Sequence, residues 1–230
     1  MLKYSGDVTH GDWIVRSDID PNRLITFGPA GFDAYARLRF LPDPAYVGQE
    51  EGDVEVEPSA PTKLEMLVHA ADALVAFTGT PDHGFFCVWE SGVTSPTAMP
   101  REHARIAVPL RDSFLIEGPL SELSAWFDDL RLEPYDHPSF IWPADRAWCI
   151  AADVDPSWAG VGASATAISH LLVVPGLDCV AADPAAPVAR YGSASSGPAR
   201  FTRAASDGEP VVTDLDGWGL RTRPDEPTVD

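Results

Sequence analysis

The stretch AWCIAADVDPSWAG (residues 147–160) decides the fold, because it has the pattern of a buried strand that ends in two carboxylates and a proline. Side chains alternate between the two faces of a strand. Trp148 and Ile150 therefore share one face, and Cys149 and Ala151 on the other face are apolar as well. A strand that is apolar on both faces is typical of the middle of a covered sheet, so we expect a central strand here.

A second stretch, WIVRSDIDP (residues 13–21), matches WCIAADVDP (residues 148–156) at the tryptophan, both aspartates and the proline. Read with the same period of two, it predicts a strand with an apolar face and a polar face that carries Asp18 and Asp20. Each stretch is followed by a glycine-containing loop, a helix-like run and a proline. These shared features indicate either a duplicated strand–loop–helix unit or two similar strands of one sheet.

The two Asp-x-Asp-Pro endings have a structural and a functional interpretation. Proline keeps the preceding residue extended and has no N–H to donate, so the aspartates accept from loop amides and the proline ends the strand. Alternatively, Asp153 and Asp155 bind a divalent cation, since hard cations prefer clustered oxygens. Asp18 and Asp20 would join them if the two strands were neighbours, and four crowded carboxylates need a cation because they otherwise raise each other's pKa. We favour the structural interpretation and predict no metal.

The run GVGASA (residues 160–165) gives the pattern G-x-G-x-x-A before a predicted helix. In a dinucleotide-binding fold the glycines close the turn directly after the strand. Here DVDPSW stands between the strand and the first glycine, so we expect a tight loop instead. The sequence also lacks G-x-x-x-x-G-K-[ST], G-x-S-x-G, H-E-x-x-H and C-x-x-C motifs. We therefore predict no cofactor.

The net charge of −19 and the cysteine content limit the class of protein. Binding to nucleic acid or to an anionic membrane needs clustered cations, and the chain has 16 Lys and Arg against 35 Asp and Glu. We expect no nucleic-acid or membrane partner, and the charge favours a basic protein as partner. No apolar run approaches the ~18 residues that span a bilayer. Three widely spaced cysteines predict free thiols in a reducing compartment, hence a cytoplasmic protein.

Two regions of biased composition divide the chain. Residues 42–61 carry six acids, four prolines and no base, which predicts an exposed acidic loop. Residues 190–230 are rich in Pro, Gly, Ser and Ala without sustained periodicity, so we expect a loosely attached tail. Residues 1–189 then form a single domain. The candidates for docking the tail are Val211, Leu215 and Trp218.

Helices and hairpins alternate irregularly along the predicted domain. Thr62 and Glu65 form a capping box before an apolar helical run, and a second helix is expected over about 119–131. Hairpins are predicted near residues 111–112 and 143–146. This order predicts an α+β fold in which a mostly antiparallel or mixed sheet packs against three to four helices.

Several polar and aromatic residues have both a functional and a structural interpretation. Glu65, His69 and Asp72 share one face of the capped helix, as a two-carboxylate, one-histidine group would. That face lies opposite the apolar stripe, so we expect it to be solvated. Trp158 and Trp218 lie in predicted loops beside glycine. They are candidates either for a contact surface or for ordinary packing.

The stretch FIWPADRAWCIAADVD (residues 140–155) resembles a segment that recurs in a family of uncharacterised proteins from high-GC bacteria. The resemblance covers residues 135–180. No activity is known for that family, so the resemblance implies no catalytic or binding residue. It implies a self-contained bacterial cytoplasmic protein. The residues that carry it are Phe140, Trp142, Pro143, Asp145, Arg146, Trp148, Asp153 and Asp155.

Two functions follow from these observations. The first is a non-enzymatic, acidic, cytoplasmic protein-binding module, and an immunity-type inhibitor of a basic toxin fits the charge. Its surface would be the acidic loop together with Asp18 and Asp20. The second is a metal-dependent or small-molecule enzyme with Asp153, Asp155 and Arg146 near a pocket. Arg146 and Asp155 would lie at opposite ends of one strand, roughly 30 Å apart, so we favour the first function.

Overall fold

The computed structural model describes residues 1–90, 104–130, 132 and 136–192, and the backbone of 199–204 and 210–215. The chain forms two compact units. The first comprises Met1–Asp43 and Val54–Pro187, and the second comprises Pro44–Asp53 and Val188–Asp230.

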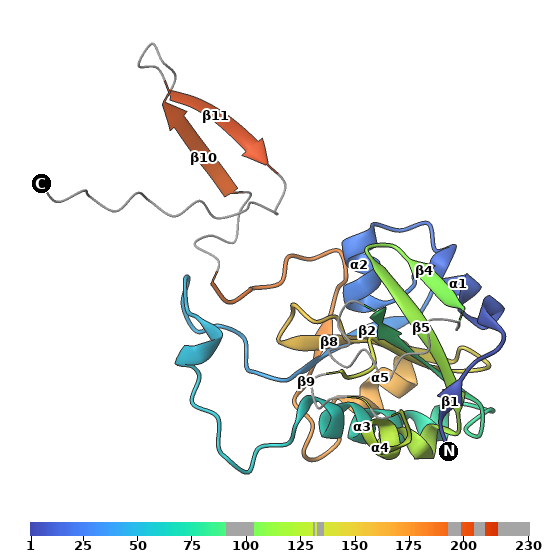
Figure 1. Ribbon diagram of the computed structural model, residues 1–230. Helices are drawn as coiled ribbons and strands as arrows, with labels where there is room; N and C mark the ends of the chain where they lie inside the picture. Colours follow the sequence, from blue (N-terminus) through green and yellow to red (C-terminus); the bar gives the residue numbers. More distant parts are fainter. Residues whose placement is uncertain (91–103, 131, 133–135, 193–198, 205–209, 216–230) are drawn as a thin grey trace, which may run out of the picture. The chain divides into compact units, whose positions relative to one another are not determined.

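The first unit is built on a nine-stranded sheet in the order β1-β5-β3-β6-β7-β8-β2-β9, with β4 also paired to β5 (Figure 1). Every pair of neighbouring strands is antiparallel, so the predicted α+β class with an antiparallel sheet is confirmed. The strands are β1 (Lys3–Tyr4), β2 (Ala34–Arg39), β3 (Gly84–Trp89), β4 (Arg105–Val108), β5 (Arg111–Gly118), β6 (Phe140–Pro143), β7 (Trp148–Ala151), β8 (Trp158–Ala163) and β9 (Cys179–Ala182).

Helices cover both faces of this sheet, and two apolar cores lie between the layers. One face carries α1 and α2, while the other carries α3, α4 and α5 (Figure 1). Where three or four helices were expected, the described residues contain five α-helices, of which α1 and α4 are single turns. The helices and 3-10 turns are η1 (Val8–Gly11), α1 (Asp12–Val15), α2 (Pro21–Phe27), η2 (Glu51–Asp53), α3 (Lys63–Leu74), η3 (Val75–Phe77), η5 (Leu120–Ala125), α4 (Trp126–Leu130) and α5 (Ala165–Leu171).

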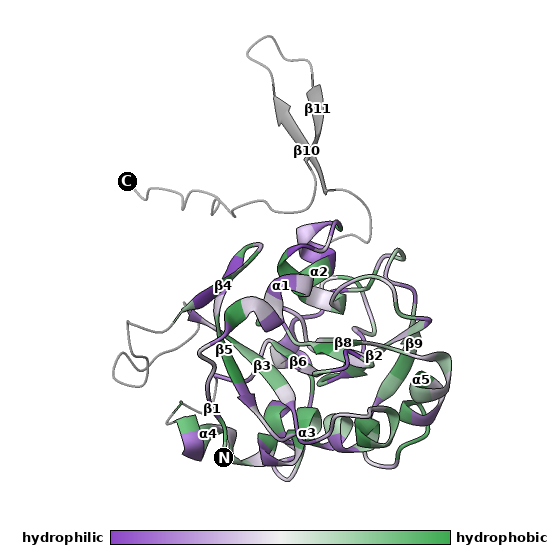
Figure 2. Cartoon of the chain, turned by 90° about the vertical axis from the view of Figure 1, so that its right-hand side faces the viewer, coloured by the Kyte–Doolittle hydropathy of each residue, from purple (hydrophilic) through white to green (hydrophobic). Residues whose placement is uncertain are grey.

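Strand β7 lies in the middle of the sheet and is buried on both faces, as its sequence predicts. Trp148 and Ile150 belong to the core under α3 and α5, and Cys149 and Ala151 belong to the core under α1 and α2. Strand β8 is buried along its whole length as well, and Figure 2 shows hydrophobic residues along β3 and β5. The alternation of a strand therefore places successive residues of β7 in two different cores.

The first Asp-x-Asp-Pro stretch does not form the predicted strand. It forms α1, then a short loop, and then Asp20 caps α2 by accepting hydrogen bonds from the amides of Asn22 (3.0 Å) and Arg23 (3.1 Å). Pro21 occupies the first helical position, where no amide donor is needed. Asp-Pro is thus a helix start here, and the two matching stretches share sequence but not local structure. The duplication stays a prediction.

The glycines of GVGASA lie inside β8, so the predicted tight loop is wrong. A Cβ on Gly160 would collide with the carbonyl oxygen of Thr26 and the Cα of Phe27, and one on Gly162 would collide with the ring of Phe32. Two glycines of one strand face therefore allow the end of α2 and the loop after it to pack directly on β8.

In the second unit, β10 (Ala199–Ala204) and β11 (Pro210–Leu215) form an antiparallel pair in which Phe201 lies opposite Thr213. The sequence pattern of the tail does not predict this pair. Val211 and Leu215 lie on β11, whereas Trp218 lies outside the described residues.

Candidate functional site

Both carboxylates of the second Asp-x-Asp stretch bind one arginine, Arg111. Its Nε donates to Asp153 Oδ1 (2.9 Å), and its Nη2 donates to Asp153 Oδ2 (3.2 Å) and Asp155 Oδ2 (3.1 Å). The side chain of Asp153 is 4% exposed and that of Arg111 is 15% exposed, while Asp155 is 53% exposed. We call these three residues the Arg111 cluster.

The Arg111 cluster joins strands that are not neighbours. Arg111 begins β5 and the aspartates follow β7, so β3 and β6 lie between them in the sheet. A two-residue turn, Pro109–Leu110, brings the chain back from β4, and Leu110 adopts a left-handed φ of 68°. Trp89, at the end of β3, lies 4.5 Å from the guanidinium. Nη1 also donates to the Leu110 carbonyl (3.3 Å), so every nitrogen of the guanidinium makes a hydrogen bond.

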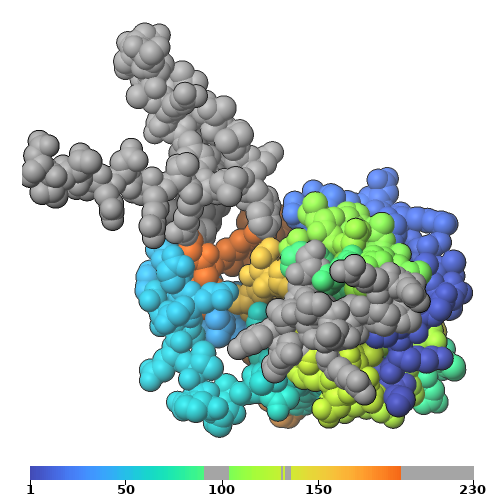
Figure 3. Space-filling view, in the orientation of Figure 1, coloured from blue at the N-terminus to red at the C-terminus, as the bar shows by residue number. Residues whose placement is uncertain are grey.

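This geometry supports a structural role for the Asp-x-Asp pair, although its carboxylates accept from the Arg111 guanidinium and not from loop amides as expected. A metal ion would have to displace a guanidinium that already binds both carboxylates through three hydrogen bonds. Across the described parts of the chain, no group of three or more His, Cys, Asp or Glu residues is arranged to hold a metal ion. Asp18 and Asp20 are exposed in the loop before α2 and do not join Asp153 and Asp155 in such a group. The N-terminal segment that contains this loop is blue in Figure 3.

Arg146, which the enzyme hypothesis placed with the aspartates, lies at the other end of β7. It occupies the β6–β7 turn with a φ of 58°, and its guanidinium lies 5.3 Å from the ring of Trp13. Arg111, and not Arg146, binds the two aspartates. No motif in the sequence indicates this contact. Asp153 lies 42 positions from Arg111, and such a contact follows from the strand order of the whole sheet, which local patterns do not specify.

Asp145, in the segment that carries the family resemblance, fixes the β6–β7 turn. It accepts hydrogen bonds from the Gly79 amide (2.7 Å), the Thr78 hydroxyl (2.8 Å) and the Ala147 amide (3.1 Å). Burial would raise the pKa of Asp145, but these hydrogen bonds lower it below its ordinary value. In this segment, Asp145 therefore fixes a turn, and the aromatic residues that carry the resemblance are buried in the core.

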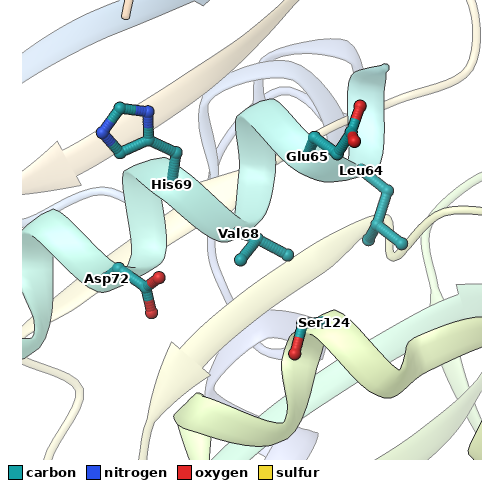
Figure 4. A pocket seen from close by; sticks show the side chains of 6 residues that line it. All are labelled: Leu64, Glu65, Val68, His69, Asp72 and Ser124. Carbon is teal, nitrogen blue, oxygen red and sulfur yellow. The ribbon is translucent and has the colours of Figure 1, made fainter. Parts of the chain in front are cut away.

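A shallow groove of about 370 Å³ lies between α3 and η5 and contains the proposed two-carboxylate, one-histidine group (Figure 4). The predicted capping box is present, because the Glu65 carboxylate accepts from the Thr62 amide (2.7 Å) and hydroxyl (2.8 Å). Glu65, His69 and Asp72 lie along one face of α3 and all line the groove, but in Figure 4 the Glu65 and His69 side chains point one way and the Asp72 carboxylate points another. The three side chains diverge, so the groove presents no converging catalytic group.

The three cysteines are free, and none of them is an activated nucleophile. Cys87 and Cys149 are buried, and burial raises the pKa of both thiols well above the ordinary value. Burial also raises the pKa of Cys179 to about 12. The thiolate is the reactive form of cysteine, so these thiols are expected to be inert at neutral pH.

We expect the native protein to react with iodoacetamide at pH 8 at less than about a tenth of the rate of an exposed thiol. Mass spectrometry should find Cys87 and Cys149 unmodified until urea unfolds the chain, after which all three cysteines are labelled. Labelling of Cys87 or Cys149 in the native protein at the rate of an exposed thiol would show that one of them is activated.

Trp158 is not a surface residue. It begins β8, the residue is 6% exposed, and the centroid of its ring lies 4.9 Å from that of Phe27. Arg37 lies 5.5 Å from the same ring. The predicted loop position is wrong because the chain turns before Trp158 rather than after it, and the tryptophan belongs to the core.

The acidic loop, residues 42–61, gathers six carboxylates, most of them exposed. Asp43, at its start, is bound by Arg37 (2.6 Å) and Arg39 (3.2 Å), and these arginines lower its pKa. The four glutamates that follow are exposed, and no described cation lies within ion-pair distance of Glu50, Glu51, Glu55 or Glu57. Between them stand the exposed apolar side chains Tyr46 (59%), Val47 (65%) and Val56 (53%).

Comparison with protein-family models, with curated proteins and with solved structures finds no match to this chain. No helix in the described ranges is long and apolar enough to cross a membrane.

Proposed function

We propose that the protein is a non-enzymatic binding module whose acidic loop recognises a basic protein. The cluster of four exposed glutamates within residues 50–57, which make no ion pair with a described residue, carries this proposal. Carboxylates such as Asp153 and Asp178 are held by arginines of the same chain. The four glutamates of the loop have no such partner among the described residues, so lysines or arginines of a second protein would supply the missing cations.

The loop also has the mixed character of a protein interface. Exposed aromatic and aliphatic side chains, here Tyr46, Val47 and Val56, stand among the charges, and such anchors contribute most of the energy of many interfaces. Asp18 is exposed and stays a predicted contributor, whereas the carboxylate of Asp20 already caps α2. An immunity-type inhibitor of a basic toxin, acting in a bacterial cytoplasm, is the form of this function that the charge and the free thiols favour.

The alternative of an enzyme built on the Asp-x-Asp pair is not favoured by the geometry. A general base or metal ligand needs a carboxylate that is open to a substrate or an ion. Asp153 is buried and bidentately bound, and Asp155 shares the same guanidinium.

The proposal is tested by neutralising the loop. Proteins that the wild-type chain captures from a bacterial lysate at low salt would be identified, purified and titrated by calorimetry against two variants. One carries glutamine at Glu50, Glu51, Glu55 and Glu57. The matched control removes four exposed charges elsewhere, with asparagine at Asp33, Asp72, Asp82 and Asp128.

We expect the loop variant to bind the purified partner roughly tenfold more weakly or worse, since four exposed ion pairs are lost. The control should stay within about twofold, and the affinity of the wild type should fall steeply as salt rises. Equal affinities of the two variants would place the binding surface elsewhere, and the absence of any basic partner would contradict the proposed function.

A further inference from the structure

The acidic loop leaves the first unit and returns to it at neighbouring points. Just before the loop, the Leu41 amide donates to the carbonyl of Ser157 (3.2 Å). Just after the loop, Lys63 begins α3, and its ammonium lies 5.4 Å from the ring of Phe40. The contact between Phe40 and Lys63 brings the two ends of the loop together. The first of these ends carries Asp43, which is the last residue of the first unit before the chain enters the second.

The carboxylate of Asp43 is bound by two arginines of β2. Nη1 and Nη2 of Arg37 donate to its two oxygens at 2.6 and 2.9 Å, and Nη1 of Arg39 donates to Oδ2 at 3.2 Å. A bidentate arginine–carboxylate pair fixes the direction of the two side chains as well as their distance. Both oxygens of Asp43 are therefore engaged within the first unit, at the point where the loop begins.

The two arginines that bind Asp43 are themselves held in place. Arg37 and Arg39 lie on one face of β2, since side chains two residues apart in a strand point the same way. The Arg37 guanidinium lies 5.5 Å from the Trp158 ring, and Arg39 donates to Oδ1 of Asp178 at 2.6 and 3.1 Å. The two arginine side chains are only 12% and 22% exposed. Asp43 is thus tied to a strand that pairs on both sides.

We propose that Asp43 is a positioning residue of the acidic loop, and that its ion pairs with Arg37 and Arg39 fix the point at which the loop leaves the first unit. This inference rests on the proposed function, because the loop needs positioning only if it binds a partner. A segment that is ordered before binding loses less conformational entropy on binding, which strengthens the complex without a new contact. Asp43 acts through the backbone that follows it and does not contact the partner.

The loss of Asp43 is expected to leave the fold intact. Its side chain is 35% exposed, so water can take its place beside the guanidinium groups. Arg39 keeps Asp178 as its partner at 2.6 Å. The Arg111 cluster differs, because Asp153 is 4% exposed and a change there reaches the core. The effect of removing Asp43 therefore falls on the order of the loop and not on the stability of the sheet.

The first test measures the order of the loop in the free, full-length protein by NMR relaxation of backbone amides. In the wild type, the amides of Asp43 and Ala45 should have order parameters of about 0.8, and Asp43→Ala should lower both below about 0.6. The Leu41 amide, which is bonded to Ser157, should keep its value. Asp43→Glu retains the carboxylate and should restore most of the order. Thermal unfolding verifies that each variant folds, and Asp43→Asn replaces the alanine variant if that one does not.

The second test measures the affinity for the purified basic partner by calorimetry. Asp43→Ala should bind it about three- to tenfold more weakly than the wild type, with the loss in the entropy of binding. Asp43→Glu should stay within about twofold of the wild type. The matched control is Glu90→Ala, which removes the same charge from a residue that is 39% exposed, lies outside the acidic loop and pairs with Arg105 at 2.6 Å. It should also stay within about twofold.

The outcomes separate this inference from the proposed function. The absence of a basic partner contradicts the proposed function, and the order parameters of the free protein then decide whether Asp43 holds the loop. A partner that binds Asp43→Ala as tightly as the wild type, but binds the glutamine variant of the loop more weakly, leaves the proposed function in place and overturns the inference. Order parameters that Asp43→Ala does not change also overturn it, as does an equal loss of affinity in Glu90→Ala.

Discussion

Arg111→Ala is expected to lower the free energy of unfolding by about 3–5 kcal/mol, because it leaves a buried carboxylate without its cation. The side chain of Asp153 is 4% exposed, so water does not replace the lost hydrogen bonds at 2.9 and 3.2 Å. The variant also loses the contact of the guanidinium with the Trp89 ring. Urea unfolding of the wild type and the variant, followed by tryptophan fluorescence, measures the difference.

Two further variants separate charge burial from the loss of any arginine. Arg16→Ala breaks an ion pair with Asp12 in which the arginine side chain is 78% exposed, and it should cost less than about 1 kcal/mol. Adding Asp153→Asn to Arg111→Ala removes the buried charge and should recover part of the loss. A loss below about 1 kcal/mol for Arg111→Ala would mean that Asp153 finds another partner.

Gly160→Ala is expected to lower the free energy of unfolding by about 3 kcal/mol or more, because the added methyl group would overlap backbone atoms rather than a flexible side chain. Its Cβ would meet the Thr26 carbonyl oxygen and the Cα of Phe27. Helix α2 must move away from β8 to make room, which separates the rings of Phe27 and Trp158 that now lie 4.9 Å apart. The same urea titration measures the effect.

The matched control is Gly6→Ala, in which the added Cβ has no neighbour within 4 Å. It should change the free energy of unfolding by no more than about 0.5 kcal/mol. A loss of similar size in both variants would indicate that backbone freedom, and not the packing of α2, sets the cost at Gly160.

Local patterns predict those elements whose neighbours along the chain determine their structure. The capping box of Thr62 and Glu65 and the two apolar faces of β7 are of this kind, and both are present. Asp-Pro is ambiguous, because it ends a strand as readily as it starts a helix. The period-two pattern of residues 13–21 therefore predicts a strand, although Asp20 caps α2 in the structure. The glycines of β8 are ambiguous in the same way. Glycine is favoured both in a tight turn and where a helix such as α2 packs closely against a strand, so the sequence does not distinguish the two.

The candidate site depends on contacts that no local pattern encodes. Arg111 follows an unremarkable two-residue turn, and its meeting with Asp153 requires the order β5-β3-β6-β7. The exposure of the acidic loop, in contrast, follows from its composition, since four prolines and six acids oppose burial. Charge and composition therefore predict the proposed binding surface, whereas the ion pairs within the fold need the complete sheet.

The position of β2 between β8 and β9 has a consequence for the synthesis of the chain. Residues 34–39 leave the ribosome long before either neighbouring strand exists. Ala36 and Leu38, which are fully buried in the finished sheet, stay exposed to water or to chaperones in the meantime. Pairing between segments so distant along the chain is slow, so the nascent first unit completes its sheet only after β9 has emerged.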